Sequence, residues 1–302
     1  MNSDSDTAWN DFWAAERAAG KGGGCLPQGW AGIEEAQKRA WLSIARLCRR
    51  GARVLDLATG DGRVLRWLRQ ARPDLKLVGI DAAPQLPAAP QGCKVRAGVR
   101  MEKLPFAADK FDLVTSQFGF EYGDAARVAR EIARVLLPGG RAALMVHRGD
   151  GPILAHNLTR RTAITWALEE RDIMGVAKGA LVMQGMAANA VQKLGAIAAE
   201  GARLFGEGSA AWELPEAVRQ TLVLGLQRDP ESVGGTLALL EERARNELGR
   251  IASLESACGT ADAREVMLEH LVGGGLRLEG VQEIAEQGAR PFADLIVLRR
   301  ST

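Results

Sequence analysis

The chain has 302 residues, of which 47% are hydrophobic and 25% are charged, so it can bury one large core or two smaller ones. Its formal net charge of +2 at pH 7 does not supply the concentrated basic face that nucleic-acid binding needs, which excludes nucleic acid as an expected partner. No apolar run approaches the roughly 20 residues that span a bilayer, and the first residues lack a signal-peptide pattern, so we expect a cytoplasmic protein without a membrane partner.

The N-terminal segment is predicted to form a short helix over residues 6–17. Its aromatic residues fall at helical spacing on one side, at Trp9, Phe12 and Trp13. We expect this aromatic side to dock onto the body of the protein. The glycine-rich run over 20–24 has too much backbone freedom for regular structure, and it is interpreted either as a lid or as a plain linker.

Strands and helices alternate in the next part of the chain. The predicted strands are 53–58, 76–80, 94–97, 111–116 and 141–147. The predicted helices are 32–50, 62–71 and 124–136. Alternation of this kind predicts a parallel sheet with helices on both faces. The connection after Asp81 is expected to be a loop, because Pro84, Pro87 and Pro90 prevent a continuous helix there.

The character of the sequence changes after Gly151. About a hundred residues are rich in Ala, Leu, Met, Glu and Arg, and their periodicity predicts helices with breaks near Gly175, 206–208 and 229–230. A last helix over 262–271 and a hairpin of strands 276–284 and 292–298 are expected to follow. With Met174, Met183 and Met186 among its apolar residues, the helical block is interpreted as an apolar substrate cap, a dimer interface or simply its own core.

The predicted fold is therefore α/β. It is a Rossmann-like, doubly wound and mostly parallel seven-stranded sheet with a closing antiparallel strand, plus an inserted helical cap. We divide the chain into N-terminal helices with the glycine-rich loop, a nucleotide-binding core, the helical insertion, and the last helix with the closing hairpin. These parts correspond to residues 1–50, 51–150, 151–260 and 261–302.

The first motif is the strand-turn-helix Asp56-Leu57-Ala58-Thr59-Gly60-Asp61-Gly62. A tight turn with Gly60 and Gly62 lets a nucleotide-like ligand approach the backbone closely, because no β-carbon occupies the ligand's space. The dinucleotide fingerprint needs a third glycine, and its position is taken by Leu65.

An acid ahead of this Gly-x-Gly resembles the first motif of class I S-adenosylmethionine-dependent methyltransferases, in the small-molecule (type 11/25-like) branch. Ala58 stands where that family usually has glycine. The resemblance implies that Asp56 helps to hold the amino-acid end of S-adenosylmethionine. It implies that the cofactor is wrapped by the residues of the turn and the helix start, Ala58, Thr59, Gly60, Gly62 and Arg63.

A second acid, Asp81, ends the next strand about twenty residues later, where a carboxylate can accept both hydroxyl hydrogens of a ribose. Ala82 beside it is included in the predicted cofactor site. Three further segments resemble later motifs of the same branch: Glu102-Lys103-Leu104-Pro105-Phe106, Phe111-Asp112-Leu113-Val114 and Leu137-Pro138-Gly139-Gly140-Arg141. Related sequences often carry an adenine-binding acid shortly before Leu-Pro-Phe, where this chain has Arg100, so only the backbone of Met101 is predicted to contact the adenine. Glu102 beside it is included in the predicted cofactor site.

Methyl transfer from a sulfonium is an in-line displacement, which depends on alignment and water exclusion rather than on one obligatory set of catalytic residues. Candidates are expected at the carboxyl ends of the fourth and fifth strands, where ligands bind in open α/β sheets. Gln117 and Phe118 are predicted to lie beside the cofactor or to pack in the core. Tyr122, with Glu121 next to it, and His147 are the catalytic candidates, as groups that orient or deprotonate an acceptor hydroxyl or amine.

The methyl acceptor is predicted to be a small molecule that is methylated on oxygen or nitrogen. Its predicted contacts are Trp30, Tyr122, Arg148 and His156, the last two as groups that could bind a substrate carboxylate. No metal site is predicted, because the four cysteines are scattered and no Cys-x-x-Cys pair or histidine cluster occurs. A homodimer is a further possibility for the assembly.

Two other functions stay open. A nicotinamide-dependent oxidoreductase would share Asp81, but the missing third glycine and the later motifs disfavour it. A non-catalytic S-adenosylmethionine-binding regulatory protein would share the fold, since a fold does not prove chemistry. Nucleic-acid methylation is disfavoured, because the fourth strand does not end in the tetrapeptide that grips a flipped base.

Overall fold

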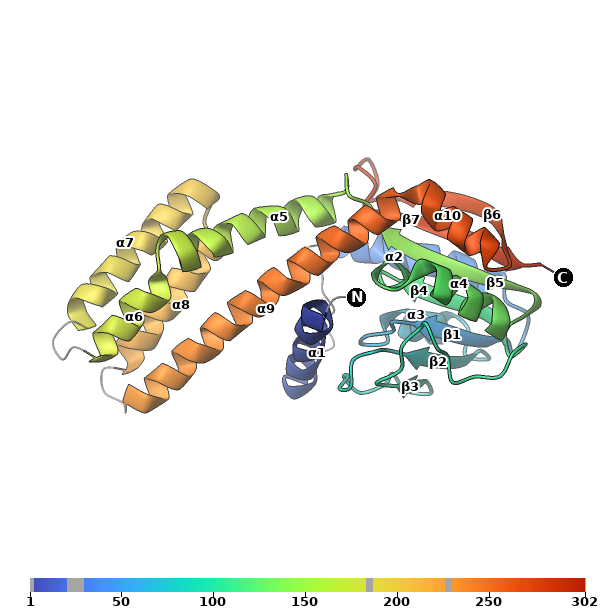
Figure 1. The fold of residues 1–302 in the computed structure, drawn as a ribbon, viewed down its shortest axis with the longest axis horizontal. Helices are drawn as coiled ribbons and strands as arrows, with labels where there is room; N and C mark the ends of the chain where they lie inside the picture. The colour runs from blue at the N-terminus through green and yellow to red at the C-terminus, as the bar shows by residue number, and fades with distance from the viewer. Residues whose placement is uncertain (1–2, 21–29, 183–186, 226–229, 302) are drawn as a thin grey trace. The chain divides into compact units, whose positions relative to one another are not determined.

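The computed structural model describes residues 3–20, 30–182, 187–225 and 230–301 (Figure 1). Two compact units result. The first consists of Met1–Leu154 with Ala252–Thr302, and the second is Ala155–Ile251. Most of the predicted glycine-rich run, together with Met183 and Met186, falls outside the described residues.

The first unit is built on a seven-stranded sheet with the order β3-β2-β1-β4-β5-β7-β6. The strands are β1 (Arg53–Leu57), β2 (Lys76–Ile80), β3 (Lys94–Arg96), β4 (Phe111–Gln117), β5 (Leu136–His147), β6 (Leu276–Ile284) and β7 (Ala293–Arg300). β1 to β5 pair in parallel, whereas β7 is antiparallel to both of its neighbours. This topology confirms the predicted Rossmann-like sheet with a closing antiparallel strand.

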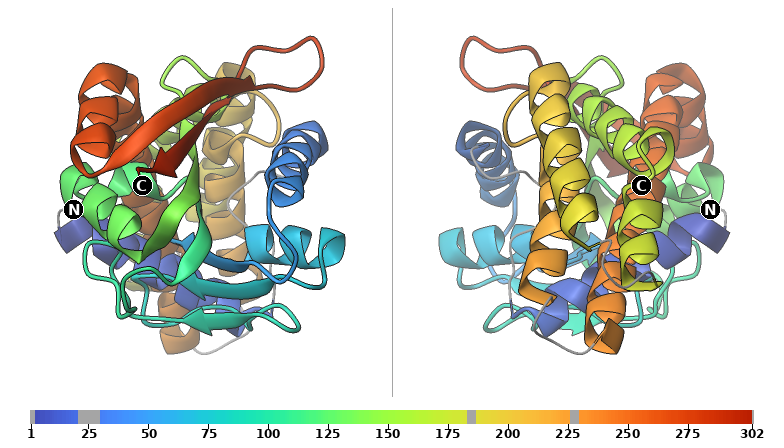
Figure 2. Two further views of the ribbon diagram at one scale, coloured as in Figure 1. Left: turned by 90° about the vertical axis from the view of Figure 1, so that its right-hand side faces the viewer. Right: turned by 90° about the vertical axis from the view of Figure 1, so that its left-hand side faces the viewer.

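Helices cover both faces of the sheet (Figure 2). The helices of the first unit are α1 (Ser3–Ala18), α2 (Ala31–Arg46), α3 (Arg63–Ala71), α4 (Ala125–Val135) and α10 (Arg264–Gly273), with a 3-10 turn η1 (Phe120–Tyr122). Figure 2 shows α4 and α10 on one face and α2 and α3 on the other. Asp124 caps α4 by accepting a hydrogen bond from the Arg127 amide at 3.0 Å. None of the helices in the described ranges has the length and apolar character that a membrane span needs.

The sheet differs from the prediction at the start of β5, which begins at Leu136 instead of at residue 141. Leu136 pairs with Phe111, and Arg141 next pairs with Leu113, so the Pro-Gly-Gly segment forms an irregularity inside the strand. A proline and two glycines normally end a strand, but a bulge accommodates them here.

The second unit is helical. Its helices are α5 (Pro152–Thr165), which begins in the first unit, the π-turn η2 (Trp166–Glu170), α6 (Ile173–Val182), α7 (Ala187–Phe205), α8 (Ala210–Gly225) and α9 (Pro230–Asp262), which ends in the first unit. Met174 is buried in the core of this unit. The break expected near Gly175 lies earlier, at Asp172. That residue has φ = 46° and accepts a hydrogen bond from the Gly175 amide at the start of α6.

The two ends of this insertion meet in the first unit. The Gly149 amide, two residues after β5, donates a hydrogen bond of 3.1 Å to the side chain of Asp262, the last residue of α9. The chain therefore leaves the sheet and returns to it at one place.

Candidate active site

The predicted ligand-binding turn joins the end of β1 to the start of α3. Ala58, Gly60 and Gly62 all have positive φ angles, of 51°, 52° and 71°. This conformation is unfavourable for a residue with a β-carbon, so the backbone of Ala58 is strained. Phe118, after β4, also has a positive φ of 54°. Two non-glycine residues with this strained conformation thus belong to the predicted site, as is common where function constrains the backbone.

Asp56 is buried on β1 and is held by two hydroxyl groups. Its carboxylate accepts hydrogen bonds from the Oγ1 atoms of Thr59, at 2.6 Å, and Thr115, at 2.7 Å. Burial raises the pKa of Asp56 to about 7, although the two hydrogen bonds act in the opposite direction. A cation that binds beside Asp56 would favour the ionised form that burial disfavours.

The stability of the protein should fall with pH because of Asp56. A carboxyl with a pKa raised to about 7 is protonated in the folded chain where the unfolded chain has already ionised, so stability decreases as pH rises towards 7. We expect the wild type to lose roughly 2–3 kcal/mol more than Asp56→Asn between pH 5 and pH 8. Urea unfolding of both proteins across this range measures the difference. Parallel curves would show that the Asp56 pKa is ordinary.

Asp81, at the end of β2, is buried and closes onto the glycine turn. Its carboxylate accepts hydrogen bonds from the amides of Gly60 and Ala83, both at 2.9 Å, and burial raises its pKa. Ala82 between them is exposed. Since β1 and β2 are neighbours, the two acids that are twenty-five positions apart in sequence lie at the same edge of the sheet. The structure therefore brings the two predicted acids and the turn together.

Helix α1 covers the glycine turn. A β-carbon placed on Gly60 would stand 2.5 Å and 2.7 Å from Cζ2 and Cη2 of Trp13, so the indole rests directly on that glycine. One turn earlier, the ring of Trp9 meets Tyr122 edge to face at 5.8 Å, and its Nε1 donates to Ser253 Oγ. The predicted aromatic side of this helix thus contacts both the cofactor side and the acceptor side of the candidate site. Trp13 was not among the predicted site residues.

The acceptor side contains a buried carboxylate-imidazole pair. Glu121 Oε1 lies 2.8 Å from Nδ1 of His147 and also accepts a hydrogen bond from the His147 amide at 3.0 Å. Glu121 is 2% exposed and His147 is 7% exposed. The imidazole stacks on Phe118 with ring centroids 4.0 Å apart, and Tyr122 meets it edge to face at 6.1 Å. The structure brings the three predicted catalytic residues into one cluster.

The carboxylate fixes which ring nitrogen can accept a proton. A carboxylate can only accept a hydrogen bond, so the pairing with Glu121 assigns the ring hydrogen to Nδ1 of His147 and leaves Nε2 as the acceptor nitrogen. The second oxygen of Glu121 is buried and has no hydrogen-bond partner within the described residues. This negative charge stabilises the positive charge that forms on the ring when His147 accepts a proton.

Gln117, at the end of β4, is held from α2. Its Oε1 accepts a hydrogen bond of 2.6 Å from Nε1 of Trp41, and its Nε2 donates to Oε1 of Gln37 at 3.2 Å. Gln37 and Trp41 were not predicted, because a glutamine and a tryptophan on an amphipathic helix give no signal of a site. These two residues reach the candidate site only because α2 packs beside the end of β4.

The predicted adenine side lies around the start of α4. Met101 is buried, and its methyl group packs against Gly123. Glu102 accepts hydrogen bonds from Arg100 at 3.3 Å and from the Asp124 amide at 3.4 Å. Arg63, at the start of α3, lies over the Trp67 ring. These positions for the adenine contacts and for Arg63 stay predictions.

Arg148, which is predicted to bind a substrate carboxylate, forms ion pairs within the protein, and its contact with a substrate stays a prediction. Its guanidinium already pairs with Asp150 at 2.9 Å, Glu283 at 2.7 Å and Asp294 at 3.1 Å. The three carboxylates neutralise the positive charge of the guanidinium. Through Glu283 and Asp294, Arg148 links the end of β5 to β6 and β7.

The other two predicted substrate residues stay predictions. Trp30 immediately precedes α2 and is half-buried. His156 belongs to the second unit, where burial and the neighbouring Arg160 lower its pKa.

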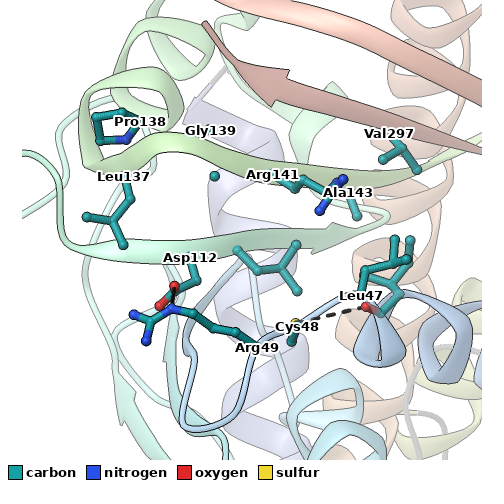
Figure 3. Close-up of a pocket in the computed structure, with 13 residues that line it drawn as sticks. Leu47, Cys48, Arg49, Asp112, Leu137, Pro138, Gly139, Arg141, Ala143 and Val297 are labelled. Atoms are coloured by element: carbon teal, nitrogen blue, oxygen red, sulfur yellow. Dashed lines mark hydrogen bonds and ion pairs between the residues drawn. The ribbon is translucent and has the colours of Figure 1, made fainter. Parts of the chain in front are cut away.

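A cavity of about 330 Å³ opens elsewhere on the first unit, at the amino ends of β4 and β5 (Figure 3). Its charged lining residues are already paired, Arg49 with Asp112 and Arg141 with Glu279 at 2.8 Å. Ligands of open α/β sheets bind at the carboxyl ends of the strands, which is the opposite edge. The glycine turn and the Glu121–His147 pair, which lie at the carboxyl ends, therefore remain the candidate site.

Comparison with known proteins identifies similar methyltransferases. Residues 55–144 match a family model described as a methyltransferase domain. The chain is 36% identical over 123 residues to a demethylmenaquinone methyltransferase of Deinococcus radiodurans, covering 38% of this chain and 50% of that protein. It is also 36% identical over 121 residues to the ubiquinone/menaquinone biosynthesis C-methyltransferase UbiE of Geobacter sulfurreducens, covering 35% of this chain and 47% of that protein.

Among solved structures, an S-adenosylmethionine-dependent methyltransferase from Mesorhizobium loti is similar with a TM-score of 0.42 at 16% identity, over 89% of this chain and 98% of that one. The chain spans about half the length of the curated relatives it matches. The matched residues include the glycine turn, both buried acids and Glu121. Residues 55–144 of the chain therefore match the methyltransferase domain model, and S-adenosylmethionine is the cofactor that this match supports.

Proposed function

We propose that the protein transfers a methyl group from S-adenosylmethionine to a small-molecule acceptor whose reacting group must lose a proton. The observation that carries this proposal is the buried Glu121–His147 pair at the carboxyl ends of the strands, on the same edge as Asp56 and Asp81. A protein that only binds the cofactor would need Asp56 and Asp81 but no proton acceptor. A carboxylate-oriented imidazole beside them favours catalysis over regulation.

The residues present fit the cofactor. Asp56 suits its ammonium group, because burial leaves the carboxylate without a counter-charge in the absence of a cation. Asp81 suits the ribose, because each of its two oxygens accepts one hydrogen bond from a backbone amide and can accept a second from a ribose hydroxyl. When bound, S-adenosylmethionine supplies a methyl group on a positively charged sulfur, which is displaced in line.

The protein's own contribution is to hold and to deprotonate the acceptor. His147 Nε2 takes the proton of the acceptor's hydroxyl or amine, and Glu121 stabilises the resulting imidazolium. The acceptor's electron pair would then form the new bond to the methyl carbon, and the electron pair of the broken carbon–sulfur bond would stay on sulfur. Phe118 and Tyr122, which flank the imidazole, can pack against an apolar acceptor.

C-methylation of a quinol ring is a second candidate. The relatives named above are demethylmenaquinone and ubiquinone/menaquinone methyltransferases, the latter acting on carbon by name. Removing a phenolic proton also activates the neighbouring ring carbon, so the same His147 could serve that reaction. The aromatic side chains around the imidazole suit a planar ring. A substrate cap or a dimer interface remains our proposal for the helical unit Ala155–Ile251.

Calorimetric titration tests the cofactor first. Micromolar-range binding of S-adenosylmethionine and S-adenosylhomocysteine, without binding of NADH, is the expected result. A methylation assay with catechols, amines and short-chain demethylated quinols then tests the acceptor class by mass spectrometry. Binding of NADH alone would overturn the proposal. Cofactor binding without turnover of any acceptor would favour the regulatory alternative.

Trp13 should compete with the cofactor. Its indole rests on Gly60, where the cofactor must approach the protein backbone closely. Helix α1 therefore has to shift before the cofactor is fully bound. The apparent affinity is reduced by the fraction of molecules in which the site is covered. We expect Trp13→Ala to bind S-adenosylhomocysteine about tenfold more tightly, given the roughly 1.5–3 kcal/mol that burial of a large apolar side chain contributes.

The exposed Trp212 of α8 provides the matched control, because Trp212→Ala removes an indole far from Gly60 in sequence and in a different compact unit. Its affinity for S-adenosylhomocysteine should equal that of the wild type. Weaker binding by Trp13→Ala would mean that the indole contacts the bound cofactor and does not compete with it.

A further inference from the structure

Three side chains form a hydrogen-bonded chain whose orientation is fixed. The indole Nε1 of Trp41 can only donate, so the atom of Gln117 that faces it, at 2.6 Å, must be the oxygen. Gln117 therefore donates a hydrogen bond from its Nε2 to Gln37, at 3.2 Å, and the acceptor must be the side-chain oxygen of Gln37. No amide flip is compatible with this chain.

The last member of this chain is left with an unused donor. Gln37 is fully buried, and its Nε2 has no hydrogen-bond partner within the described residues. A buried amide donor without a partner is unfavourable, and native structures rarely leave one unless a ligand or water completes it. The unused donor therefore points to an acceptor atom that binds beside it.

Gln37 lies on the side of the sheet where Asp56 is held. Gln117 is two residues beyond Thr115 on β4, so the side chains of both point to the same face of the sheet. Thr115 binds Asp56, and Gln117 binds Gln37 from α2. The donor of Gln37 is thus offered on the face of Asp56 and closer to the carboxyl end of β4, where ligands enter.

We propose that Gln37 Nε2 binds the α-carboxylate of the cofactor's amino-acid end. This inference rests on the proposed function, in which Asp56 holds the ammonium group. The carboxylate is attached to the same carbon as that ammonium, so it needs a donor on the same face of the sheet as Asp56, and Gln37 Nε2 is offered on that face. A polarised amide whose oxygen already accepts a hydrogen bond is a stronger donor, which suits an anion.

The experiment compares S-adenosylhomocysteine with its decarboxylated analogue, which lacks only the carboxylate, by calorimetry. Gln37→Met removes the donor and keeps the side-chain length. Gln37→Glu keeps an oxygen for Gln117 and replaces the donor by a second oxygen, so it covers the case in which the methionine variant does not fold. Gln70→Met is the control, since Gln70 is an exposed glutamine on α3 in the same unit.

We expect Gln37→Met to weaken S-adenosylhomocysteine binding about tenfold, as for the loss of one hydrogen bond to a charged group, and Gln37→Glu to weaken it more. The decarboxylated analogue should bind both variants as it binds the wild type, and Gln70→Met should change neither ligand. Equal weakening of both ligands would assign Gln37 a purely structural role, and unchanged binding of both would mean that it contacts no ligand; either result overturns the inference. Failure of the wild type to bind S-adenosylhomocysteine would instead overturn the proposed function.

Discussion

Replacing His147 by glutamine is expected to lower kcat for methyl transfer by about 10²–10⁴, the usual contribution of a positioned general base. The affinity for S-adenosylhomocysteine should stay within about a factor of three, because the imidazole lies on the acceptor side, stacked on Phe118 and held by Glu121. Single-turnover kinetics with saturating cofactor separates this chemical step from binding.

Two further variants distinguish a base from a structural histidine. Glu121→Gln should lower kcat as well, since an amide cannot stabilise the imidazolium. The exposed His270 on α10 supplies the control, and His270→Gln should leave kcat unchanged. A normal kcat in His147→Gln would remove the base from the mechanism.

Asp81→Ala should weaken cofactor binding roughly a hundredfold, since two hydrogen bonds from ribose hydroxyls to a charged group are lost. Asp81→Asn keeps the shape and one acceptor oxygen, so it should fall between the alanine variant and the wild type. Titration of both variants with S-adenosylhomocysteine gives the comparison.

The same residue also fastens the glycine turn through the Gly60 amide, so thermal unfolding must be measured beside binding. A variant that melts like the wild type and binds a hundredfold less tightly identifies Asp81 as a ligand contact. If the loss of affinity for S-adenosylhomocysteine is matched by a loss of thermal stability, the role of Asp81 is only to hold the glycine turn.

Sequence patterns were sufficient for the parts of the site that are local in the chain. Asp56 and the glycines belong to one strand-turn-helix, and Asp81 ends the adjacent strand, so the rule that ligands bind at carboxyl ends of parallel strands places them together. Glu121 and His147 follow β4 and β5, which are also neighbours. The alternation of strands and helices in the sequence predicts that these four residues lie at the carboxyl ends of neighbouring parallel strands.

The remaining site residues come from helices that reach the site only through packing. Trp13 and Gln37 lie on α1 and α2, whose apolar periodicity says which side is buried but not which loop it covers. The ion pairs of Arg148 could not be predicted either, because two of its partners, Glu283 and Asp294, are more than a hundred residues away on β6 and β7. Long-range pairs of this kind require the topology.

The return of α9 to the end of β5 also determines the order in which the sheet can be completed during synthesis. Ala143 of β5 pairs with Val297 of β7, so one edge of β5 stays open until the whole helical unit and the last helix have left the ribosome. Closing so long a loop costs entropy, but a helical unit that folds on its own core shortens the free chain between its ends. With Gly149 held to Asp262, the insertion then acts as a closed spacer, and β7 docks as though it followed β5 by only a short connection.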